Sequence, residues 1–198
     1  MTLPRIEPLR PVRRIEVPIG PEWIYELKLD GFRGMLEIDN GRARFTSKNS
    51  KPMPRFQPLA EQLARSLAMR SAVRSAILDG EIIVMGHDGP DFRALFFHRR
   101  APAYAAFDLL WLNGRDLRPL PLWRRKKTLR KLIDPTPAGY VDHVDNPALY
   151  AVVVQRDLEG IVAKRRSDPY GVETVWVKVK CAGYSQMAGR WELFARVR

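Results

Sequence analysis

The sequence contains little cysteine and no long apolar run. Cys181 is the one cysteine among 198 residues, so no internal disulfide can form and a metal site built from several thiolates is excluded. No apolar segment approaches the ~20 residues that a membrane-spanning helix needs, and the N-terminal segment has no apolar core of the kind found in secretion signals. We therefore expect a cytoplasmic protein, nucleoid-associated if it binds DNA, with no membrane partner.

Two common nucleotide-binding signatures are also absent. The chain has neither the glycine fingerprint of Rossmann domains nor the glycine-rich phosphate-binding loop of the Walker type. A nucleotide, if it binds here, must be held in another way.

Positive charge is what the sequence has in excess. Lysine and arginine number 34 against 22 aspartate and glutamate, which gives a formal net charge of +12 and a pI near 10.3. Such a charge favours polyanionic partners, above all nucleic acid. A basic surface that only keeps the protein soluble is the alternative, and charge alone does not separate the two.

The chain divides into three expected parts. Prolines at positions 4, 8, 11, 18 and 21 predict an extended N-terminal arm over residues 1–21. A single folded domain is expected over residues 22–181. A short C-terminal segment follows at residues 182–198, and its pattern predicts a helix over residues 186–196.

Hydrophobic periodicity defines the expected elements of the domain. Strands are predicted at residues 23–30, 32–38, 42–47, 77–85, 104–112, 160–164 and 173–180, and helices at residues 56–73, 122–133 and 147–158. Strands grouped in hairpins and interrupted by single helices predict an α+β fold. Its sheets should be largely antiparallel and flanked by helices, in contrast to a doubly wound parallel sheet.

The strand at residues 23–30 carries the first chemical signal. Side chains two residues apart in a strand point the same way, so Glu26, Lys28 and Asp30 are expected on one face. An amine between two carboxylates suits a lysine nucleophile. Taken alone, so short a pattern is more commonly explained by a surface strand with an ordinary ion pair between Glu26 and Lys28.

Four further segments favour the chemical interpretation. The sequence KLDGFR at residues 28–33 is followed in order by LDGE at 78–81, FDLL at 107–110, EGIVAK at 159–164 and WVKVK at 176–180. Together these resemble the motifs of the covalent nucleotidyltransferases, the superfamily of DNA ligases, RNA ligases and mRNA capping enzymes. The resemblance covers residues 22–181. Within the superfamily, FDLL and EGIVAK look most like the ligase domain of bacterial ATP-dependent DNA ligases used in end joining.

The resemblance implies a covalent nucleotidyltransferase fold and a role for each motif residue. Lys28 would be the nucleophile that becomes adenylylated by ATP, and Phe107 would stack on the adenine. Glu81 and Glu159 would hold Mg²⁺ or Mn²⁺, because hard cations prefer oxygen ligands. The remaining residues implied to bind the nucleotide are Glu26, Asp30, Arg33, Lys48, Glu81, Lys164, Lys178 and Lys180.

Clustered cations explain why these residue types suit the reaction. A lysine amine must lose its proton before it attacks phosphorus, and neighbouring cations disfavour its ammonium form. The same charges stabilise the phosphoryl group during transfer. Lys178 and Lys180 lie two apart on a predicted strand, so both should face one side while Val175, Val177 and Val179 face the core. A solvated strand edge protected by lysines is the alternative.

Two features depart from the family pattern. The family has Ser-Arg-Asn-Gly after the second hairpin strand, whereas this chain has SKNS at residues 47–50, so Lys48 keeps the charge but lacks the bidentate fork of arginine. Only 18 residues follow Lys180, too few for the oligonucleotide-binding barrel that usually succeeds this domain. We expect no C-terminal barrel, and a dependence on other repair proteins or on a separately encoded oligonucleotide-binding domain.

A basic amphipathic helix is expected to provide part of the DNA contact. Its cations recur within a few turns and suit binding to the phosphate backbone of nicked or broken double-stranded DNA. They are Arg124, Arg125, Lys126, Lys127, Arg130 and Lys131.

Three functions remain open at this point. The first is an ATP-dependent DNA ligase core that forms lysyl-AMP and joins a 5′-phosphate to a 3′-hydroxyl in DNA repair. The second is an RNA ligase or guanylyltransferase, which would use the same Lys28 with a different acceptor or nucleotide. The third is a truncated paralogue that binds DNA or a repair partner without completing ligation.

Overall fold

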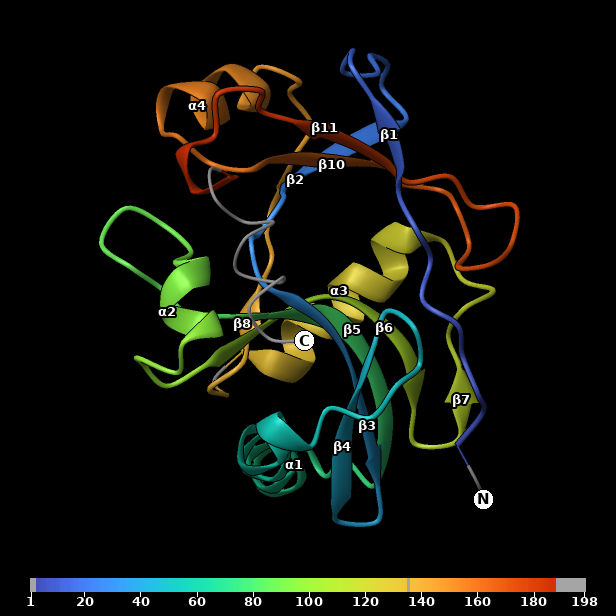
Figure 1. Cartoon of the computed structure of the whole chain (residues 1–198). Helices are drawn as coiled ribbons and strands as arrows, with labels where there is room; N and C mark the ends of the chain where they lie inside the picture. The colour runs from blue at the N-terminus through green and yellow to red at the C-terminus, as the bar shows by residue number, and fades with distance from the viewer. Residues whose placement is uncertain (1–2, 135, 188–198) are drawn as a thin grey trace.

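The computed structural model describes residues 3–134 and 136–187, which form two β-sheets flanked by helices. Figure 1 shows one sheet at the top of the molecule and the other below it. The fold is α+β with mainly antiparallel strand pairing, as the sequence predicted.

The upper sheet has five strands in the order β1-β11-β10-β2-β9. All neighbours in it are antiparallel except β1 and β11, which are parallel. The strands are β1 (Val12–Arg14), β2 (Trp23–Leu27), β9 (His143–Val144), β10 (Gly160–Arg165) and β11 (Val177–Lys180).

The lower sheet has six strands along the path β4-β3-β5-β6-β7, with β8 paired to β6. The pairing is antiparallel apart from β6 with β8. The strands are β3 (Phe32–Asp39), β4 (Arg42–Ser47), β5 (Ser75–Ile83), β6 (Ala103–Leu112), β7 (Arg115–Asp116) and β8 (Gly139–Tyr140).

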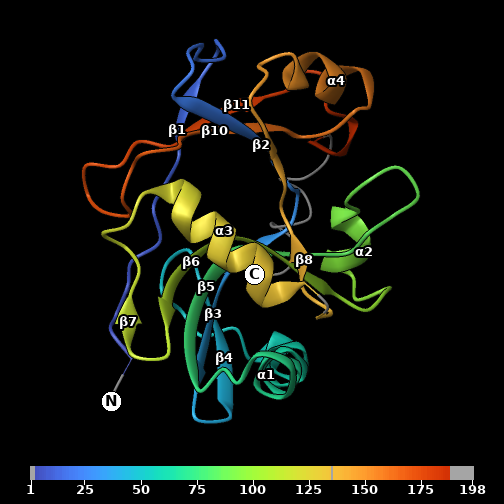
Figure 2. The same cartoon turned by 180° about the vertical axis from the view of Figure 1, so that it is seen from behind.

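Helices cover the outer faces of both sheets (Figures 1 and 2). Leu63 of α1 and Leu129 of α3 belong to one hydrophobic core with Leu36 and Leu78 of the lower sheet. Val153 of α4 packs on the upper sheet. The helices are α1 (Gln57–Ser71), α2 (Phe92–Phe96), α3 (Leu122–Ile133) and α4 (Leu149–Gln155), with single 3-10 turns at Pro54–Phe56 and Ser185–Met187. None of the helices in the described residues is both long and apolar enough to cross a membrane.

The lower sheet is apolar on both faces. Leu36 and Leu78 face α1 and α3, whereas their neighbours Met35 and Ile77 belong to a second cluster on the opposite face, toward the upper sheet. Period-two alternation therefore places successive side chains in two different cores. The space between the sheets is bounded by the second of these cores.

The chain passes from the upper to the lower sheet through residues 28–31. The strand predicted at residues 23–30 ends at Leu27, because the chain leaves β2 there and enters β3 at Phe32. The Lys28 amide donates to the Gly160 carbonyl, which ties the start of this crossing to β10. A Cβ on Gly31 would lie 2.2 Å from the Ile82 carbonyl oxygen. Glycine is required at position 31 because the backbone of β5 passes so close.

The sequence predicted the long elements well and several short ones not at all. The helix at residues 122–133 has the predicted bounds, and the hairpin of β3 and β4 is confirmed. The predicted strand at residues 173–180 is shorter, since β11 begins at Val177, and Val175 is 43% exposed instead of buried. The very short strands and α2 were missed, because elements of two to five residues contain too little periodicity to detect.

The N-terminal arm runs along the domain and contributes β1 to the upper sheet (Figure 1). Leu3, Ile6 and Leu9 pack against the cluster that contains Tyr170 and Trp176. These three residues recur every third position, which matches the period of an extended polyproline helix. The division into arm, domain and C-terminal segment stays a prediction, and most of the helix predicted at residues 186–196 lies outside the described residues.

We predict that Gly31→Ala destabilises the protein by about 1–3 kcal/mol, because the added methyl group meets the β5 backbone, which cannot move aside without disturbing both sheets. Gly171→Ala is the matched control, since nothing lies within 4 Å of the methyl group it would add. Urea unfolding of the two variants and the wild type measures the difference. Equal stability of the two variants would show that the crossing tolerates a side chain.

Candidate active site

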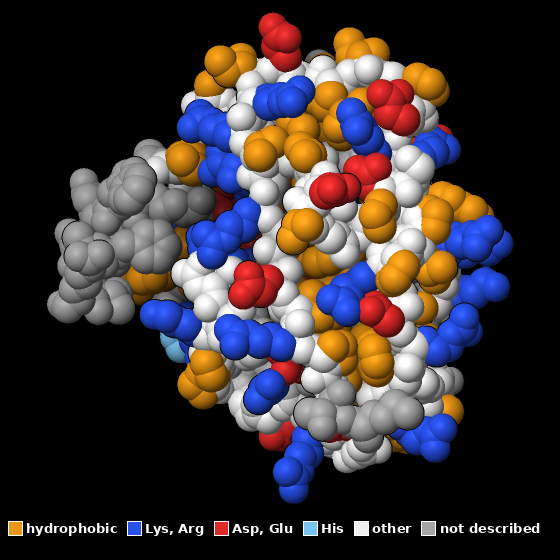
Figure 3. Space-filling view, turned by 90° about the vertical axis from the view of Figure 1, so that its right-hand side faces the viewer, with side chains coloured by type: hydrophobic (Ala, Val, Ile, Leu, Met, Phe, Trp, Pro, Cys, Tyr) orange, Lys and Arg blue, Asp and Glu red, His pale blue; other side chains and the backbone are white. Residues whose placement is uncertain are grey.

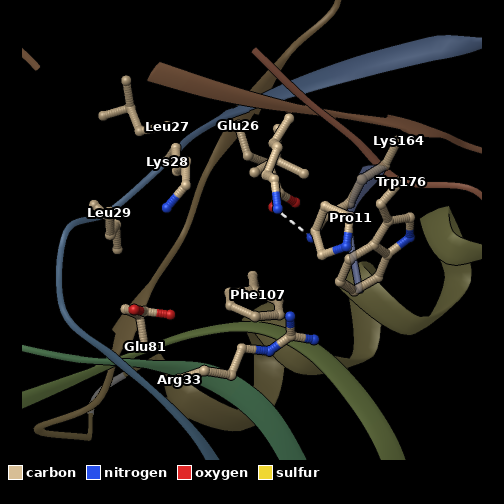
Figure 4. A pocket seen from close by; sticks show the side chains of 12 residues that line it. Pro11, Glu26, Leu27, Lys28, Leu29, Arg33, Glu81, Phe107, Lys164 and Trp176 are labelled. Carbon is tan, nitrogen blue, oxygen red and sulfur yellow. Dashed lines mark ion pairs between the residues drawn. The ribbon is translucent and has the colours of Figure 1, made fainter. Parts of the chain in front are cut away.

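A pocket opens between the two sheets where the chain crosses from one to the other. Residues from β2, the crossing, β3, β5, β6, β10 and β11 line it, so strands of both sheets contribute (Figure 4). The lining residues are Pro11, Glu26, Leu27, Lys28, Leu29, Arg33, Glu81, Phe107, Val162, Lys164, Trp176 and Lys178.

Lys28 lies at this pocket and is held by a buried carboxylate. Its Nζ atom is 2.7 Å from Oε2 of Glu159, and Oε1 of the same carboxylate is 2.9 Å from Nζ of Lys180. Glu159 immediately precedes β10, and Lys180 ends β11, which pairs with it. The Lys28 side chain is 22% exposed, against 3% for Glu159. The Lys28 amine is thus accessible to a ligand, while its ion pair with the buried Glu159 carboxylate fixes its position.

More cations surround Lys28 than the nearby carboxylates neutralise. The pKa of Lys178 is lowered, first by burial and then by the positive charges of Lys28, Lys180 and Lys48. Mutual repulsion among these ammonium groups creates a site for a polyanion such as a triphosphate. Lys48 is exposed in the turn after β4 and contributes through its charge.

Glu81 of β5 adds a carboxylate from the lower sheet. Its pKa is raised to about 7, because burial and the negative charges of Glu159 and Asp79 together outweigh the opposing charges of Lys28 and Arg33. Glu81 and Glu159 therefore come from different sheets, and both interact electrostatically with Lys28. Among residues 3–134 and 136–187, no three His, Cys, Asp or Glu side chains group in a way that would hold a metal ion by themselves.

The other end of the pocket combines aromatic rings with a buried ion cluster. Glu26 of β2 lies 2.6 Å from Nζ of Lys164. The same ammonium is 4.3 Å from the Phe107 ring centre and 4.0 Å from that of Trp176. The Phe107 and Trp176 rings contact each other edge to face, with 5.9 Å between their centres. A flat, partly polar ligand such as a purine base suits this environment, because its faces are apolar and its edge carries hydrogen-bonding groups.

Arg33 forms part of the pocket lining and is fixed by Asp79. Its Nε and Nη2 atoms donate to the two oxygens of Asp79 at 2.7 and 2.5 Å, and its Nη1 donates to the Leu9 carbonyl. Tyr170 donates to Asp79 through its hydroxyl and accepts from the Leu9 amide. These hydrogen bonds connect the N-terminal arm to Arg33, the last residue of the KLDGFR motif.

A comparison with protein families identifies the fold. Residues 11–180 match the family described as the ATP dependent DNA ligase domain. The chain belongs to this ligase family.

Relatives and solved structures agree with that assignment. The multifunctional non-homologous end joining protein LigD of Pseudomonas aeruginosa is 33% identical in an alignment 180 residues long, which covers 84% of this chain and 21% of that protein. The solved ligase domain of Mycobacterium tuberculosis LigD is 30% identical, with a TM-score of 0.64, and the match covers 80% of this chain and 53% of that one. A mycobacterial DNA ligase D complexed with ATP and MES matches with the same identity and TM-score. The chain thus spans about a fifth of the Pseudomonas protein and about half of the solved ligase domain.

Most of the residues predicted for the site meet at the pocket. Seven line it directly, namely Glu26, Lys28, Arg33, Glu81, Phe107, Lys164 and Lys178. Lys180 and Glu159 reach it through their ion pairs with each other and with Lys28. Asp30 does not line this pocket: its buried carboxylate accepts from the Tyr184 hydroxyl and lines a small adjoining cavity, which Lys28 and Glu159 also line.

The predicted DNA-binding face of α3 needs a correction. Arg125 and Lys126 are 0% and 1% exposed, so they do not belong to a surface that could contact DNA. They share the inner side of the helix with Leu122 and Leu129, which face the core. Arg125 forms a two-pronged ion pair with Asp108 of β6, and Lys126 pairs with Glu26. The exposed cations on the outer side of α3 are Arg124, Lys127, Arg130 and Lys131.

Sequence analysis missed several residues of the site. Trp176 is the first residue of the WVKVK motif, but the sequence alone assigned it no role. Its position just before Lys178 and Lys180 was the one signal that it could lie at the same pocket. Pro11 lines the pocket from the arm, and Tyr170 supports Asp79 from a loop. No local pattern marks either of them, because each reaches the site through contacts over a long sequence separation.

Glu81 should make stability depend on pH. Its pKa in the folded protein, about 7, lies above the ordinary 4.5, so the stability it contributes is present at low pH and lost as pH rises toward and through 7. Relative to Glu81→Gln, the wild type should lose at most about 1.4 kcal/mol per pH unit between pH 5 and 7, and the difference should level off above that.

Urea unfolding at several pH values measures this difference. Glu61→Gln, at an exposed position of α1, is the control and should follow the wild type. A Glu81→Gln profile parallel to that of the wild type would mean that Glu81 titrates normally.

Proposed function

We propose that this chain is the nucleotidyltransferase core of an ATP-dependent DNA ligase that acts on nicked or broken DNA in repair. The observation that carries the proposal is the position of the Lys28 amine, which lies at the pocket between an aromatic end and a cluster of lysines suited to phosphates. The relatives with the same domain include proteins named for end joining. This substrate would place the protein in the cytoplasm, at the nucleoid.

The reaction would proceed in three steps. The deprotonated Lys28 amine attacks the α-phosphorus of ATP, the bond to the β-phosphate oxygen breaks, and pyrophosphate leaves. A 5′-phosphate oxygen of the DNA then attacks the same phosphorus, the nitrogen–phosphorus bond breaks, and the amine is released. Finally the 3′-hydroxyl attacks the activated 5′-phosphate and AMP leaves, which completes the phosphodiester bond.

The surrounding residues have separate tasks in this scheme. Lys178 and Lys180 stabilise the charge on the phosphates, and Glu159 holds Lys28 in place until a nucleotide binds. Phe107 and Trp176 provide the apolar surface for the base. The pocket's fixed ion pairs keep these groups oriented before the nucleotide arrives, which reduces the cost of binding.

Glu81 and Glu159 would hold a magnesium ion together with phosphate oxygens. Two carboxylates plus substrate phosphates are a usual ligand set for Mg²⁺, and a closed cage of protein ligands is not needed. The ion would neutralise phosphate charge when bound. Its binding would favour the ionised form of Glu81.

DNA would bind through phosphate contacts. Lysine and arginine side chains are spread over the face seen in Figure 3, and they are not gathered in one stripe. The four exposed cations of α3 are one candidate surface, and the lysines around Lys28 are the other. Other repair proteins, or a separately encoded oligonucleotide-binding domain, would complete the grip on DNA.

We expect the protein to become labelled by α-labelled ATP and Mg²⁺, and Lys28→Ala to remove the label, because the proposed bond to AMP forms on the Lys28 amine. Lys131→Ala, at an exposed position of α3, should label as the wild type does. A denaturing gel with peptide mapping reads out the result. AMP found on another residue, with Lys28→Ala labelled normally, would contradict the assigned nucleophile.

The exposed face of α3 is tested by the salt dependence of DNA affinity. Replacing Arg124, Lys127, Arg130 and Lys131 by glutamine should reduce the slope of log affinity against log salt by up to about 3 to 4, if each contacts one phosphate.

Four exposed arginines elsewhere serve as the control set, replaced in the same way: Arg42, Arg65, Arg74 and Arg115. Gel shifts over a range of salt concentrations compare the two variants. Equal slopes would exclude α3 and favour the lysines around Lys28.

A further inference from the structure

Lys126 connects the inner side of α3 to the base end of the pocket. Its Nζ atom lies 2.5 Å from Oε1 of Glu26 and 2.9 Å from the Val141 carbonyl oxygen. The ammonium also lies 4.7 Å from the centre of the Tyr140 ring. The side chain is thus anchored by three neighbours, although it belongs to a helix that does not line the pocket.

Glu26 transmits this contact to Lys164. One carboxylate oxygen pairs with Lys126 and the other lies 2.6 Å from Nζ of Lys164. The pKa of Glu26 is lowered, since the two ammonium groups outweigh the effect of burial. All three side chains are at most 2% exposed. The cluster therefore sets two amines against one carboxylate next to the pocket, and burial, followed by the charge of Lys126, lowers the pKa of Lys164 despite Glu26.

Lys164 is the member of this cluster that faces the ligand space. Both it and Glu26 line the pocket, whereas Lys126 does not (Figure 4). Among the described residues its ammonium has no properly aligned hydrogen-bond acceptor, despite the ion pair with Glu26. A buried donor without an aligned acceptor is unfavourable, so an acceptor on a bound ligand would be favoured there.

We propose that Lys126 is a positioning residue for recognition of the purine base. By occupying one oxygen of Glu26, it leaves Lys164 a single carboxylate oxygen and keeps the Lys164 ammonium over Phe107 and Trp176, where it can donate to a ring nitrogen of adenine. Without Lys126, both oxygens of Glu26 become available to Lys164, which is then drawn away from the base. The inference rests on the proposed use of ATP and adds a determinant of base specificity.

A neighbouring ion pair shows what a purely structural role looks like. Arg125 and Asp108 satisfy each other through two hydrogen bonds, and Arg125 also donates to the Leu120 and Asp168 carbonyls. Neither residue lines the pocket. The Lys126 cluster differs, because two of its three members face the pocket and one lacks an aligned acceptor.

The test compares Lys126→Met with Lys127→Met, which changes the adjacent, exposed position of the same helix. Calorimetry measures the affinity of each protein for ATP, for GTP and for tripolyphosphate, which has no base. We expect Lys126→Met to bind ATP about tenfold or more weakly, corresponding to the loss of one charge-assisted hydrogen bond. Its preference for ATP over GTP should shrink, while its affinity for tripolyphosphate changes less than twofold.

The measured affinities of Lys126→Met either support or overturn the proposed role of Lys126. Equal ATP affinity of Lys126→Met and the wild type overturns the inference, and so does a parallel loss of ATP and tripolyphosphate binding, which would indicate a general structural defect. If Lys126→Met does not fold, as thermal unfolding would show, Lys126→Gln is measured under the same criteria. A wild type that binds ATP but forms no lysyl-AMP contradicts the proposed function and leaves the inference standing. A wild type that binds no ATP overturns both.

Discussion

The pocket depends on the short crossing at residues 28–31, where the chain leaves the upper sheet and enters the lower one. Gly31 permits the approach to the β5 backbone, and the Lys28 amide is fixed to Gly160 at the start of β10. The crossing contributes Lys28 and Leu29 to the lining of the pocket between the sheets. It also places Lys28, the proposed nucleophile, in residues 28–31, the part of the KLDGFR motif that belongs to neither sheet.

Charge balance inside the protein organises both ends of the pocket. Glu159 accepts from Lys28 and Lys180 at the phosphate end, and Glu26 pairs with Lys126 and Lys164 at the base end. In each case one buried carboxylate faces two ammonium groups. Buried ion pairs rarely contribute much net stability, because desolvation offsets their attraction. Their value here is orientation: each carboxylate fixes two cations and leaves an excess of positive charge for an anionic or electron-rich ligand.

Helix α3 shows how a correct local prediction can give a wrong functional interpretation. Its bounds and its amphipathic character follow from the sequence, yet two of its six cations face inward. Buried lysine and arginine are rare, so a basic helix is normally interpreted as a surface. The partners Asp108 and Glu26, which come from strands β6 and β2, supply the opposite charges that make the inward positions possible, and backbone carbonyl groups accept the remaining hydrogen bonds. Neither partner is near α3 in the sequence.

The sequence by itself determined the fold class, the long helices and strands, the family and most of the pocket residues, because these depend on local periodicity and on motifs a few residues long. The tertiary structure alone decided where β2 ends, that Asp30 lines a small cavity adjoining the pocket, and that Pro11, Tyr170 and Lys126 contact the site. Such facts depend on contacts between segments that are distant along the chain. A side chain's burial and its ionic partners are set by those contacts, and no local pattern records them.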